Sequence, residues 1–473
     1  MKSFSRDVAT ALLVAGALFM EILDATVITT AIPVIARDFS VPAAHLSIGV
    51  SAYLVAVTLF IPLSGFIADK FGAQTIFISA IIIFTFASVL CGISTSLIEF
   101  TLARILQGVG GAMMVPVGRL VVLRDLPKEK LVKTVAIITW PALSAPLLGP
   151  VLGGYIATHF SWQWIFFMNV PLGLIAVVAS MRLLKNTKAP VGKFDVKGFL
   201  LTGIGFASFM AGIEYLAGNT DAVATSLGII GLGLLLMIFA VLHVLKAPNP
   251  LFSFDAMQHR TFRLGVYGGS VVRIALGSAP FLVPLMLQLG MGYTPVEAGS
   301  LLLWLFAGNL AIKPATTWIM NAFGFKRVLV VNGILISLGF VALAFVNPDT
   351  SRVAVASLLF INGVTRSMHL TLLNTIAFAD VPTHKMRDAN TLSAILMQMN
   401  RGLGITLSAL AIAGASLILG TPAESPSLNT FTIALLFMAL LALVSIADSL
   451  MLSKKDGDAV LNKRLRKQAK KEA

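Results

Sequence analysis

The sequence predicts an all-α integral membrane protein, and three observations support this fold class. Of the 473 residues, 57 % are hydrophobic and 12 % are charged, with a mean hydropathy of +0.91. Soluble proteins carry roughly 25 % charged residues. Apolar runs recur along the whole chain, each close to the ~20 residues that a helix needs to cross a bilayer. The loops between these runs are short, which leaves little chain for a soluble domain.

The apolar runs predict fourteen membrane-spanning helices. The first run follows the segment MKSFSRD and continues past two acidic residues to Ile35, so we expect an uncleaved helix and not a signal peptide. The fourteen runs lie near residues 8–35, 46–68, 74–95, 98–122, 132–158, 164–184, 198–217, 223–245, 264–290, 296–321, 327–347, 352–378, 389–419 and 428–452.

Lys and Arg residues are distributed unequally between the two predicted sides of the membrane. If the N-terminus is cytoplasmic, the cytoplasmic segments carry almost all of the loop cations, and the opposite loops hold only Arg37 and Arg352. Cytoplasmic loops of membrane proteins are enriched in Lys and Arg, which predicts that both termini lie in the cytoplasm. The formal charge of +14 then belongs to these loops and to a basic tail that contacts membrane lipid, and we expect no nucleic-acid partner.

A repeated octapeptide indicates the domain organisation. We place the segment GFIADKFG at 65–72 in the loop after the second helix, and TWIMNAFG at 317–324 in the loop after the tenth. Eight helices separate the two copies, whereas two six-helix halves would place them six helices apart, so we infer two inserted helices. The predicted regions are an N-terminal six-helix bundle at 1–190, two inserted helices with their connections at 191–262, a C-terminal six-helix bundle at 263–453 and the basic cytoplasmic tail at 454–473.

Glu21 and Asp24 are acidic residues inside the first apolar run. Residues three apart lie on nearly the same face of a helix. A carboxylate in hydrocarbon is so unfavourable that it usually points into a helix bundle or a wet cavity. Burial favours the uncharged carboxyl group, so we interpret both residues as candidate proton carriers. The alternative is that they bond to neighbouring helices or line a wet vestibule, and we interpret Glu214, near the end of an inserted helix, as an interfacial residue.

Cations outnumber acids inside the predicted helices. Arg273 and Lys313 lie deepest, on the helices that open the second half, and we predict that they bind substrate together with Gln107 and Arg366. A cavity with more cations than acids favours an anionic substrate. Alternatively, Arg273 and Lys313 pair with the acids of the first helix, and Arg366 lies at a helix end with its charge at the membrane surface. The cations within the runs are Arg104, Arg119, Arg273, Lys313, Arg366 and Arg401.

Several classes of function are not expected from this sequence. The single cysteine, Cys91, lies in an apolar run, which excludes a disulfide framework and a cysteine metal site. The six histidines have no metal-ligand spacing, and the sequence contains no GxxxxGK[ST] loop for ATP. No nucleophile–base arrangement is visible, so we expect no enzyme, no metal and no cofactor.

Four local patterns resemble one protein family. They are GFIADKFG at 65–72, LARILQGVGGA at 102–112, APLLGPVLGG at 145–154, and the pair LDATVITTAIP at 23–33 with SWQWIFFMNVPLG at 161–173. In this order they resemble the major facilitator superfamily, and the last pair resembles its fourteen-helix branch of drug:proton antiporters. The resemblance covers the whole chain. It implies two six-helix bundles, substrate binding near the bilayer midplane, and alternating exposure of the substrate to each side.

The resemblance also implies roles for the first two motifs. Arg104 assists proton transfer in this interpretation, and the alternative is a buried hydrogen-bond anchor. Gly65, Asp69, Lys70 and Gly72 gate the conformational change. At the positions after Gly72, where the family usually carries basic residues, this sequence has Ala73 and Gln74.

The motif in the fifth predicted helix contains small residues that let helices approach closely, and a proline that can bend the helix. From the residues alone this is a packing site, and the direction of antiport is implied by the resemblance. The residues concerned are Gly149, Pro150, Gly153 and Gly154.

The predicted function is proton-coupled export of small organic molecules of the multidrug type, by a monomer in the bacterial cytoplasmic membrane. The partners are then protons and a small-molecule substrate. A first alternative is a dedicated proton-coupled exporter of an anionic metabolite or metal chelate, such as a citrate-like compound or a siderophore. A second is a non-transporting sensor, which would need a polar regulatory domain or a long tail.

Overall fold

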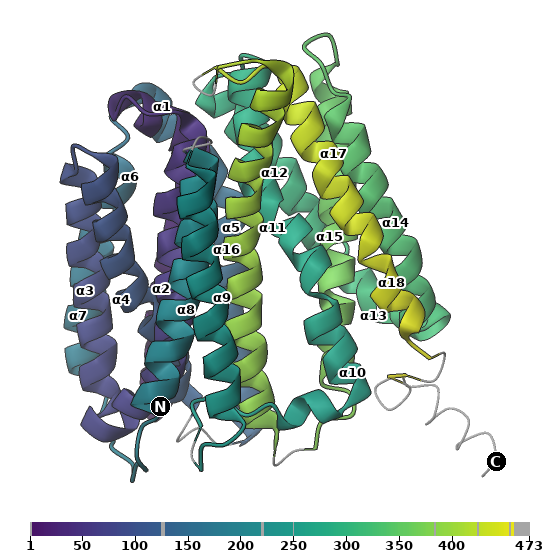
Figure 1. Ribbon diagram of the computed structural model, residues 1–473. Coiled ribbons are helices and arrows are strands. Elements are labelled where there is room, and N and C mark those ends of the chain that lie inside the picture. The colour runs from purple at the N-terminus through teal and green to yellow at the C-terminus, as the bar shows by residue number, and fades with distance from the viewer. Residues whose placement is uncertain are drawn as a thin grey trace. The chain divides into compact units, whose positions relative to one another are not determined.

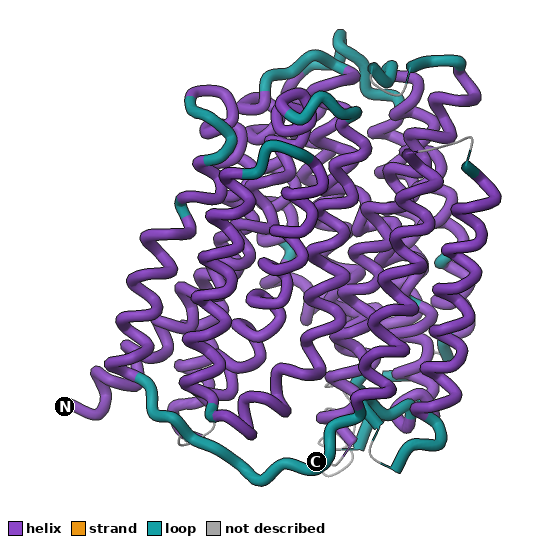
Figure 2. The backbone as a smooth tube through the Cα atoms, turned by 60° about the vertical axis from the view of Figure 1, so that its left-hand side comes forward, coloured by secondary structure: helices purple, strands orange, loops and turns teal. Residues whose placement is uncertain are grey.

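The computed structural model of the chain describes residues 2–123, 128–218, 222–248, 250–382, 385–422, 425–453 and 456–457. Within these ranges the chain forms helices joined by short loops, without any strand (Figure 1; Figure 2). The chain divides into two compact units. The first is Met1–Leu251 with Leu287–Ser300, and the second is Phe252–Met286 with Leu301–Ala473.

The first unit is a bundle of long helices. α1 packs extensively on α5, α4 packs on both α2 and α3, and α8 packs on α9. Apolar side chains such as Val14, Phe77, Phe84 and Met114 fill the interior of this bundle. Its helices are α1 (Lys2–Asp38), η1 (Ala43–Leu46), α2 (Ser47–Phe71), α3 (Ala73–Ile93), α4 (Leu97–Leu123), α5 (Lys128–His159), α6 (Trp164–Phe167), α7 (Asn169–Leu183), α8 (Val196–Gly218) and α9 (Val223–Val244).

The packing of α5 on α1 depends on glycine. A Cβ atom at Gly149 would collide with Thr26 Oγ1, and one at Gly153 would collide with the carbonyl oxygen of Val27. The Thr30 hydroxyl also donates to the carbonyl oxygen of Pro150 at 3.2 Å, which is a hydrogen bond between the two helices. Gly149 and Gly153 of the fifth-helix motif therefore lie where α5 packs closely on α1, whereas a Cβ atom at Gly154 would collide with the carbonyl oxygen of Pro295.

The GFIADKFG segment is not a loop as the sequence suggested. α2 continues through it as far as Phe71, and only Gly72 leaves the helix, with a φ of 103°. Gly65 lies inside the helix, because the apolar residues after it continue the helical pattern. A side chain at this position would meet open space. At Gly72 a side chain would be strained by the backbone conformation and would also collide with Asn186.

The two helices predicted to be inserted, α8 and α9, pair with each other and belong to the first compact unit. Asp195, just before α8, accepts hydrogen bonds from the Gly198 amide at 2.8 Å, the Leu251 amide at 3.2 Å and His243 Nε2 at 2.8 Å. Burial raises the pKa of Asp195, but these hydrogen bonds together with the His243 charge outweigh it, so the pKa lies below its ordinary value. This carboxylate therefore connects the start of α8 to the last turn of α9 and to the segment that follows α9.

Glu214 lies near the end of α8, as the sequence indicates, and its side chain contacts α2. The side chain is buried, and its two carboxylate oxygens accept hydrogen bonds from Ser47 at 2.6 Å and from Ser51 at 3.1 Å. Hydroxyl groups on α2 therefore solvate this carboxylate inside the protein, and its place at the membrane interface stays a prediction.

The second unit has a similar helical architecture. α11 packs on α16, and α14 packs on α15 and α17. Its elements are η2 (Asp255–Gln258), α10 (Arg260–Phe262), η3 (Arg263–Gly268), α11 (Ser270–Leu285), η4 (Met286–Gly290), α12 (Pro295–Ala311), α13 (Lys313–Phe323), α14 (Phe325–Ala344), α15 (Arg352–Ala377), α16 (Met386–Leu419), α17 (Leu428–Val444) and α18 (Ile446–Met451); η4 and the start of α12 extend into the first unit.

A bend of 49° separates α12 from α13. Pro314 lies in the first turn of α13, where its ring is tolerated but its missing N–H prevents α12 from continuing unbroken. The single predicted run at 296–321 is thus two helices set at an angle.

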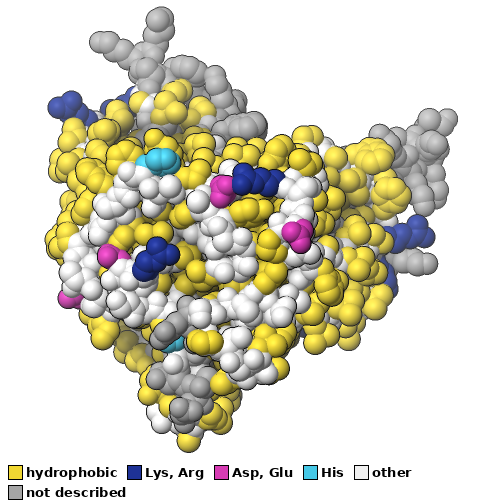
Figure 3. Space-filling model, turned by 90° about the horizontal axis from the view of Figure 1, so that it is seen from above, with side chains coloured by type: hydrophobic (Ala, Val, Ile, Leu, Met, Phe, Trp, Pro, Cys, Tyr) yellow, Lys and Arg dark blue, Asp and Glu magenta, His cyan; other side chains and the backbone are white. Residues whose placement is uncertain are grey.

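Among the described residues, twelve helices are long and apolar enough to cross a membrane, and the bent pair α12 and α13 adds a thirteenth. Figure 3 shows hydrophobic side chains over most of the surface in view, with scattered charged groups. The predicted all-α membrane fold is confirmed. The count of fourteen helices, which would include the three-proline helix α5, stays a prediction. The predicted domain boundaries also stay predictions. The basic tail at 454–473 lies outside the described residues except for Asp456 and Gly457.

Candidate functional site

The first unit contains a buried ion pair between Asp24 on α1 and Arg104 on α4. Arg104 Nη1 lies 2.7 Å from Asp24 Oδ2, and Arg104 and Asp24 are 0 % and 2 % exposed. The other carboxylate oxygen, Asp24 Oδ1, accepts hydrogen bonds from Gln107 Nε2 at 3.0 Å and from Asn169 Nδ2 at 2.7 Å. Three donors therefore point at one carboxylate, and this geometry fits its deprotonated form.

Gln107 connects this carboxylate to the rest of the bundle. Its Oε1 accepts from Arg104 Nη1 at 2.5 Å and from Cys91 Sγ at 3.8 Å. Its Nε2 also donates to Ser88 Oγ at 2.8 Å, and Asn169 Nδ2 lies 3.2 Å from the same hydroxyl. We call Asp24, Ser88, Arg104, Gln107 and Asn169 the Asp24 network, and its members come from α1, α3, α4 and α7.

Aromatic rings cover the guanidinium of Arg104. Its Cζ lies 4.4 Å from the centre of the Tyr53 ring and 6.0 Å from that of Phe166. A desolvated cation over an aromatic face gains about 2 kcal/mol. Arg104 Nε has no hydrogen-bond partner among the described residues. The aromatic rings and the Asp24 carboxylate are therefore groups that take the place of water around this guanidinium.

Glu21, one turn before Asp24, belongs to the edge of this site. Its carboxylate hydrogen-bonds with the Tyr53 hydroxyl, and Tyr53 also stacks on Arg104. Glu21 is partly exposed, whereas Asp24 is closed off from solvent. The two acids that the sequence brings together are therefore both linked to Arg104, one directly and one through Tyr53.

The glycines of the α4 motif bring the backbones of neighbouring helices close to the network. A Cβ atom at Gly108 would lie 2.6 Å from the Tyr53 carbonyl oxygen on α2. One at Gly110 would lie 2.7 Å from the Phe84 amide nitrogen on α3. These contacts are tighter than real Cβ atoms make, so only glycine lets α4 pack this closely and place Arg104 beside Asp24.

The Asp24 carboxylate joins three helices through its contacts. Removing one partner of a buried ion pair leaves an uncompensated charge, which is strongly unfavourable. Asp24 on α1 is bound to Arg104 and Gln107 on α4 and to Asn169 on α7, so loss of either charge would affect the packing of all three helices.

Sequence reasoning selected Asp24, Arg104 and Gln107 but missed Ser88 and Asn169. The signal for Asn169 was its position in the SWQWIFFMNVPLG motif, whereas a single serine in an apolar helix gives almost none. The structure places Gln107, which the sequence assigned to substrate, inside the Asp24 network with both ends of its amide engaged.

The second unit holds the predicted substrate cations. Arg273 on α11 is 5 % exposed and donates from Nη1 to the Gly265 carbonyl oxygen at 2.7 Å and from Nη2 to Asn374 Oδ1 at 2.9 Å. Arg366 on α15 donates to the Leu276 carbonyl oxygen at 2.8 Å. Neither arginine has a carboxylate within salt-bridge distance among the described residues, so their compensation comes from neutral dipoles.

Arg401 on α16 lies beside α11, since a Cβ atom at Gly277 would lie 3.3 Å from Arg401 Cα, and Arg366 donates to the carbonyl oxygen of the preceding residue, Leu276. Lys313, at the start of α13, is exposed and donates to Thr371 Oγ1 at 3.0 Å. We call Arg273, Arg366 and Arg401, which lie on or against α11, the cationic cluster. The alternative of pairing with the acids of α1 does not describe Asp24, whose charged partner is Arg104.

The motif at the end of α2 shows a different kind of contact. The ammonium group of Lys70 lies 5.8 Å from the centre of the Phe66 ring and 5.3 Å from that of Phe71. The carbonyl oxygen of Asp69 accepts a hydrogen bond from the Ala189 amide at 2.9 Å. Within the described part of the chain, no three His, Cys, Asp or Glu side chains come together as a metal site.

Helical units with many candidate spans and a buried charge network define a multi-pass membrane transporter. The chain belongs to the Major Facilitator Superfamily, because the model of that family matches residues 14–405. This confirms the resemblance that the motifs carry.

Curated relatives agree with this assignment. The chain is 35 % identical over 400 residues to proteins of Escherichia coli O139:H28 and Shigella boydii serotype 18, with 84 % of both chains covered in each comparison. Both are provisionally named multidrug resistance protein MdtD. These relatives agree with the resemblance to drug transporters of this superfamily that the motifs carry.

Solved structures with low sequence identity share the fold. A bacterial homologue of the human lysosomal transporter Spinster, inward-facing and unoccupied, has a TM-score of 0.66 and 15 % identity, covering 96 % of this chain and 98 % of that one. A mutant of the nucleoside transporter NupG has a TM-score of 0.63 and 12 % identity, with 93 % of this chain and 98 % of that one covered.

Proposed function

We propose that this chain is a proton-coupled exporter of small organic molecules that works by alternating access, with Asp24 as the proton-binding group. The observation that carries the proposal is the Asp24 network. It is a carboxylate deep in a transmembrane bundle that holds an arginine and two amides in place. Intramembrane acids of this kind mark ion pathways. The MdtD relatives support a substrate of the multidrug type.

The mechanism follows from the charge of Asp24. In the deprotonated state Asp24 fixes Arg104, Gln107 and Asn169, which joins α1 to α4 and α7. A proton arriving from outside neutralises Asp24, releases Arg104 and allows the helices to separate. Each proton crossing inward supplies about 2.3 kcal/mol per 100 mV of membrane potential, which drives export uphill. Glu21 assists by exchanging protons with Asp24 through the region around Tyr53.

A second candidate is export of an anionic metabolite or metal chelate. The observation that favours it is the cationic cluster of Arg273, Arg366 and Arg401, with Lys313 as a further cation of the same unit. In this proposal a carboxylate or phosphate of the substrate replaces the carbonyl dipoles that now compensate for these charges. In both proposals Gln107 acts through the Asp24 network, because both ends of its amide are engaged there.

The test is transport in proteoliposomes that contain the full-length protein. Uptake of a lipophilic cation and of citrate into inverted vesicles is measured with and without an imposed pH gradient. Wild-type protein is expected to accumulate one of these two substrates, and to do so only when the pH gradient is present. Asp24→Asn is expected to keep exchange without a gradient but to lose accumulation, because the amide cannot carry a proton.

A matched control lies on the same helix. Asp38 accepts a hydrogen bond from Trp162 Nε1 at 2.8 Å near the end of α1, outside the Asp24 network. Asp38→Asn is expected to retain gradient-driven accumulation. If Asp24→Asn accumulates substrate with an unchanged pH profile, the assignment of the proton site is wrong.

The remaining predicted residues belong to the same proposal. Gly72 gives the tight turn between α2 and α3, and Asp69 and Lys70 gate the change of state at this end of the bundle, with Gly65 as a flexible point within α2. The close contact of α5 with α1, at Gly149 and its neighbouring motif residues, keeps these two helices moving as one. Exchanging Gly72 for Ala is expected to slow transport without changing substrate affinity, as measured by initial rates at several substrate concentrations.

We further propose that the protein acts as a monomer in the bacterial cytoplasmic membrane with both termini in the cytoplasm. The excess of Lys and Arg in the loops on one side supports this orientation. Fusion of alkaline phosphatase to each terminus is expected to give inactive phosphatase. Active phosphatase at either terminus would reverse the orientation.

A further inference from the structure

A cavity of about 840 Å³ lies between α13, α14 and α15 in the second unit. It extends to Ile312, the residue at which the chain bends by 49° between α12 and α13. Its volume falls in the range of about 300–1,000 Å³ that is common for ligand pockets. No residue of the Asp24 network lines this cavity, and neither does Arg273, Arg366 or Arg401.

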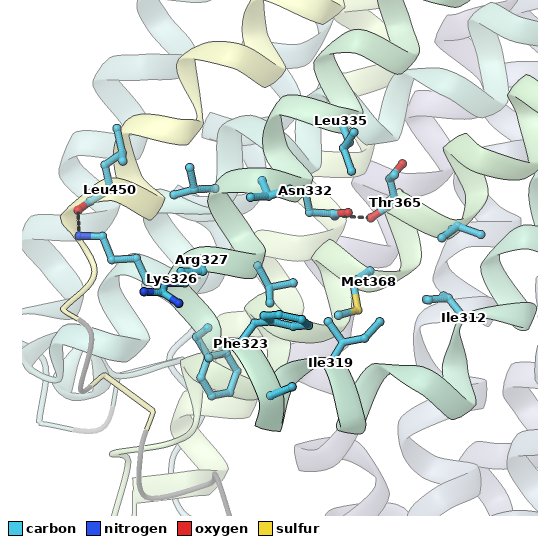
Figure 4. A pocket seen from close by; sticks show the side chains of 17 residues that line it. Ile312, Ile319, Phe323, Lys326, Arg327, Asn332, Leu335, Thr365, Met368 and Leu450 are labelled. Atoms are coloured by element: carbon cyan, nitrogen blue, oxygen red, sulfur yellow. Dashed lines mark hydrogen bonds between the residues drawn. The ribbon is translucent and has the colours of Figure 1, made fainter. Parts of the chain in front are cut away.

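The walls of the cavity are hydrocarbon over most of their length. Figure 4 shows Ile319, Phe323 and Met368 facing the space. In this apolar part, Asn332 Nδ2 donates to the Thr365 carbonyl oxygen at 2.6 Å and Thr365 Oγ1 donates to the Asn362 carbonyl oxygen at 3.0 Å. An occupant of this part therefore needs no polar atoms, and a hydrocarbon chain fits it best.

Positive charge is confined to one end of the cavity. Lys326 and Arg327 line it near Leu450, at the end opposite Ile312 (Figure 4). Lys326 Nζ donates to the Leu450 carbonyl oxygen at 2.7 Å, and Arg327 is exposed with no hydrogen bond or ion pair among the described residues. The residues that line the cavity include no Asp or Glu.

The position of these cations relative to the membrane points to the source of the ligand. The candidate span that contains α14 begins at Phe325, so Lys326 and Arg327 are the next two residues after its start. Residues at the start of a span lie at the level of the lipid headgroups, and the rest of the cavity lies beside hydrocarbon. Basic pockets between transmembrane helices bind anionic lipid headgroups.

We propose that this cavity binds one anionic phospholipid of the surrounding leaflet, with its phosphate at Lys326 and Arg327 and an acyl chain beside Ile319, Phe323 and Met368. The charge at one end and the hydrocarbon along the rest match the two parts of such a molecule. A zwitterionic lipid matches the apolar part only, because its own ammonium group already neutralises its phosphate. The bound chain fills the space at the bend between α12 and α13.

The first test maps the lipid on the unmodified full-length protein. The protein is reconstituted into nanodiscs with phosphatidylglycerol that carries a diazirine in one acyl chain, irradiated and analysed by peptide mass spectrometry. We expect labelling concentrated in residues 312–335 and 364–368. Labelling spread evenly over all spans, or equal labelling of this region by the matching phosphatidylcholine, would overturn the proposal.

The second test uses charge variants and native mass spectrometry of the full-length protein with added lipid. Lys326→Gln with Arg327→Gln should weaken phosphatidylglycerol binding about ten- to thirtyfold and leave phosphatidylcholine binding unchanged. The exchange Lys326→Arg with Arg327→Lys keeps both charges and should retain binding. Ile319→Trp, which fills the apolar part, should reduce phosphatidylglycerol binding while both cations remain.

The matched control is the pair Arg182→Gln and Lys185→Gln, which removes two exposed cations at the end of α7 in the first unit that do not line the cavity. This control should bind phosphatidylglycerol as the wild type does. An equal loss in both glutamine pairs would indicate a general effect of surface charge and overturn the proposal. Unchanged binding in Ile319→Trp would place the lipid outside the cavity and overturn it as well.

Discussion

Arg104 in the first unit and Arg273 in the second are both buried arginines on transmembrane helices, but their charges are compensated differently. Arg104 lies 2.7 Å from a carboxylate oxygen of Asp24. Arg273 donates to the Gly265 carbonyl oxygen and to the side-chain amide of Asn374. The first arrangement contains a carboxyl group, which is chemically able to bind a proton, whereas the partners of Arg273 are neutral carbonyl and amide groups.

This difference separates the two tasks of a coupled transporter. A proton changes the net charge of the Asp24–Arg104 pair, so its energy depends on pH and on the membrane potential. The charge of Arg273 is fixed, because its partners are neutral and arginine stays protonated in proteins. The first unit is thus suited to the proposed proton coupling, and the second to an anion that needs a permanent counter-charge.

The largest expected effect is that of Arg104→Met on stability. It leaves the Asp24 carboxylate buried without its counter-charge, and breaking a buried pair in this way costs about 3–5 kcal/mol. Thermal unfolding in detergent at pH 7 measures the loss. The double variant Asp24→Leu with Arg104→Met removes both charges and should recover most of the stability; failure to recover it would mean that packing and not charge holds the site.

Arg273→Met should have a smaller effect on stability. It leaves a carbonyl oxygen and an amide oxygen without a donor but creates no buried charge, so we expect a loss of about 1–3 kcal/mol. The same unfolding measurement applies. A loss equal to that of Arg104→Met would remove the proposed distinction between the two units.

The asparagines beside the two arginines sharpen the comparison on function. Asn169→Ala removes a donor to Asp24, and Asn374→Ala removes an acceptor for Arg273, so each should cost about 1.5–3 kcal/mol as a hydrogen bond to a charged group. Only Asn169→Ala should shift the pH profile of gradient-driven transport. Only Asn374→Ala should change the apparent affinity for an anionic substrate, and a reversal of these results would reverse the roles of the units.

The smallest expected effect concerns Asp195, a carboxylate paired at the membrane surface and not in its interior. Its pKa is lower in the folded protein than the usual value of about 3.9, so its stabilising contribution is present above that pH and is lost as the pH falls through the folded pKa. Asp195→Asn should lower stability by at most about 1 kcal/mol at pH 7. The difference from wild type should shrink below about pH 4, and a difference that grows there would contradict the assignment.

The sequence predicted the helices well because each span carries a strong signal. A run of about twenty apolar residues between polar loops can cross the bilayer. In lipid its backbone N–H and C=O groups must hydrogen-bond to each other, and a helix achieves this. The predicted runs at 74–95 and 428–452 correspond to α3 and to α17 with α18. The segment at 65–72 was mistaken for a loop because two glycines suggested a turn, whereas the apolar residues after Gly65 continue the helical pattern and α2 ends only at Phe71.

The candidate site could be predicted only in part. Asp24 and Arg104 are conspicuous because a charge in an apolar run is unfavourable and needs a reason. Their pairing is not written in the sequence, because it depends on how α1 and α4 face each other. Ser88 and Asn169 are neutral and small, so their presence in a helix is unremarkable until the fold places them beside a carboxylate.

The burial of Cys91 has a practical consequence for spectroscopy. This residue is the only cysteine of the chain, is fully buried and contacts Gln107 through its sulfur. Thiol reagents that react from solvent should therefore leave the wild-type protein unlabelled, and the native cysteine need not be removed from beside the Asp24 network. A cysteine introduced at an exposed position in each unit then carries a spin label or fluorophore. Distances between such labels at different pH values would record the motion of the transporter during its cycle.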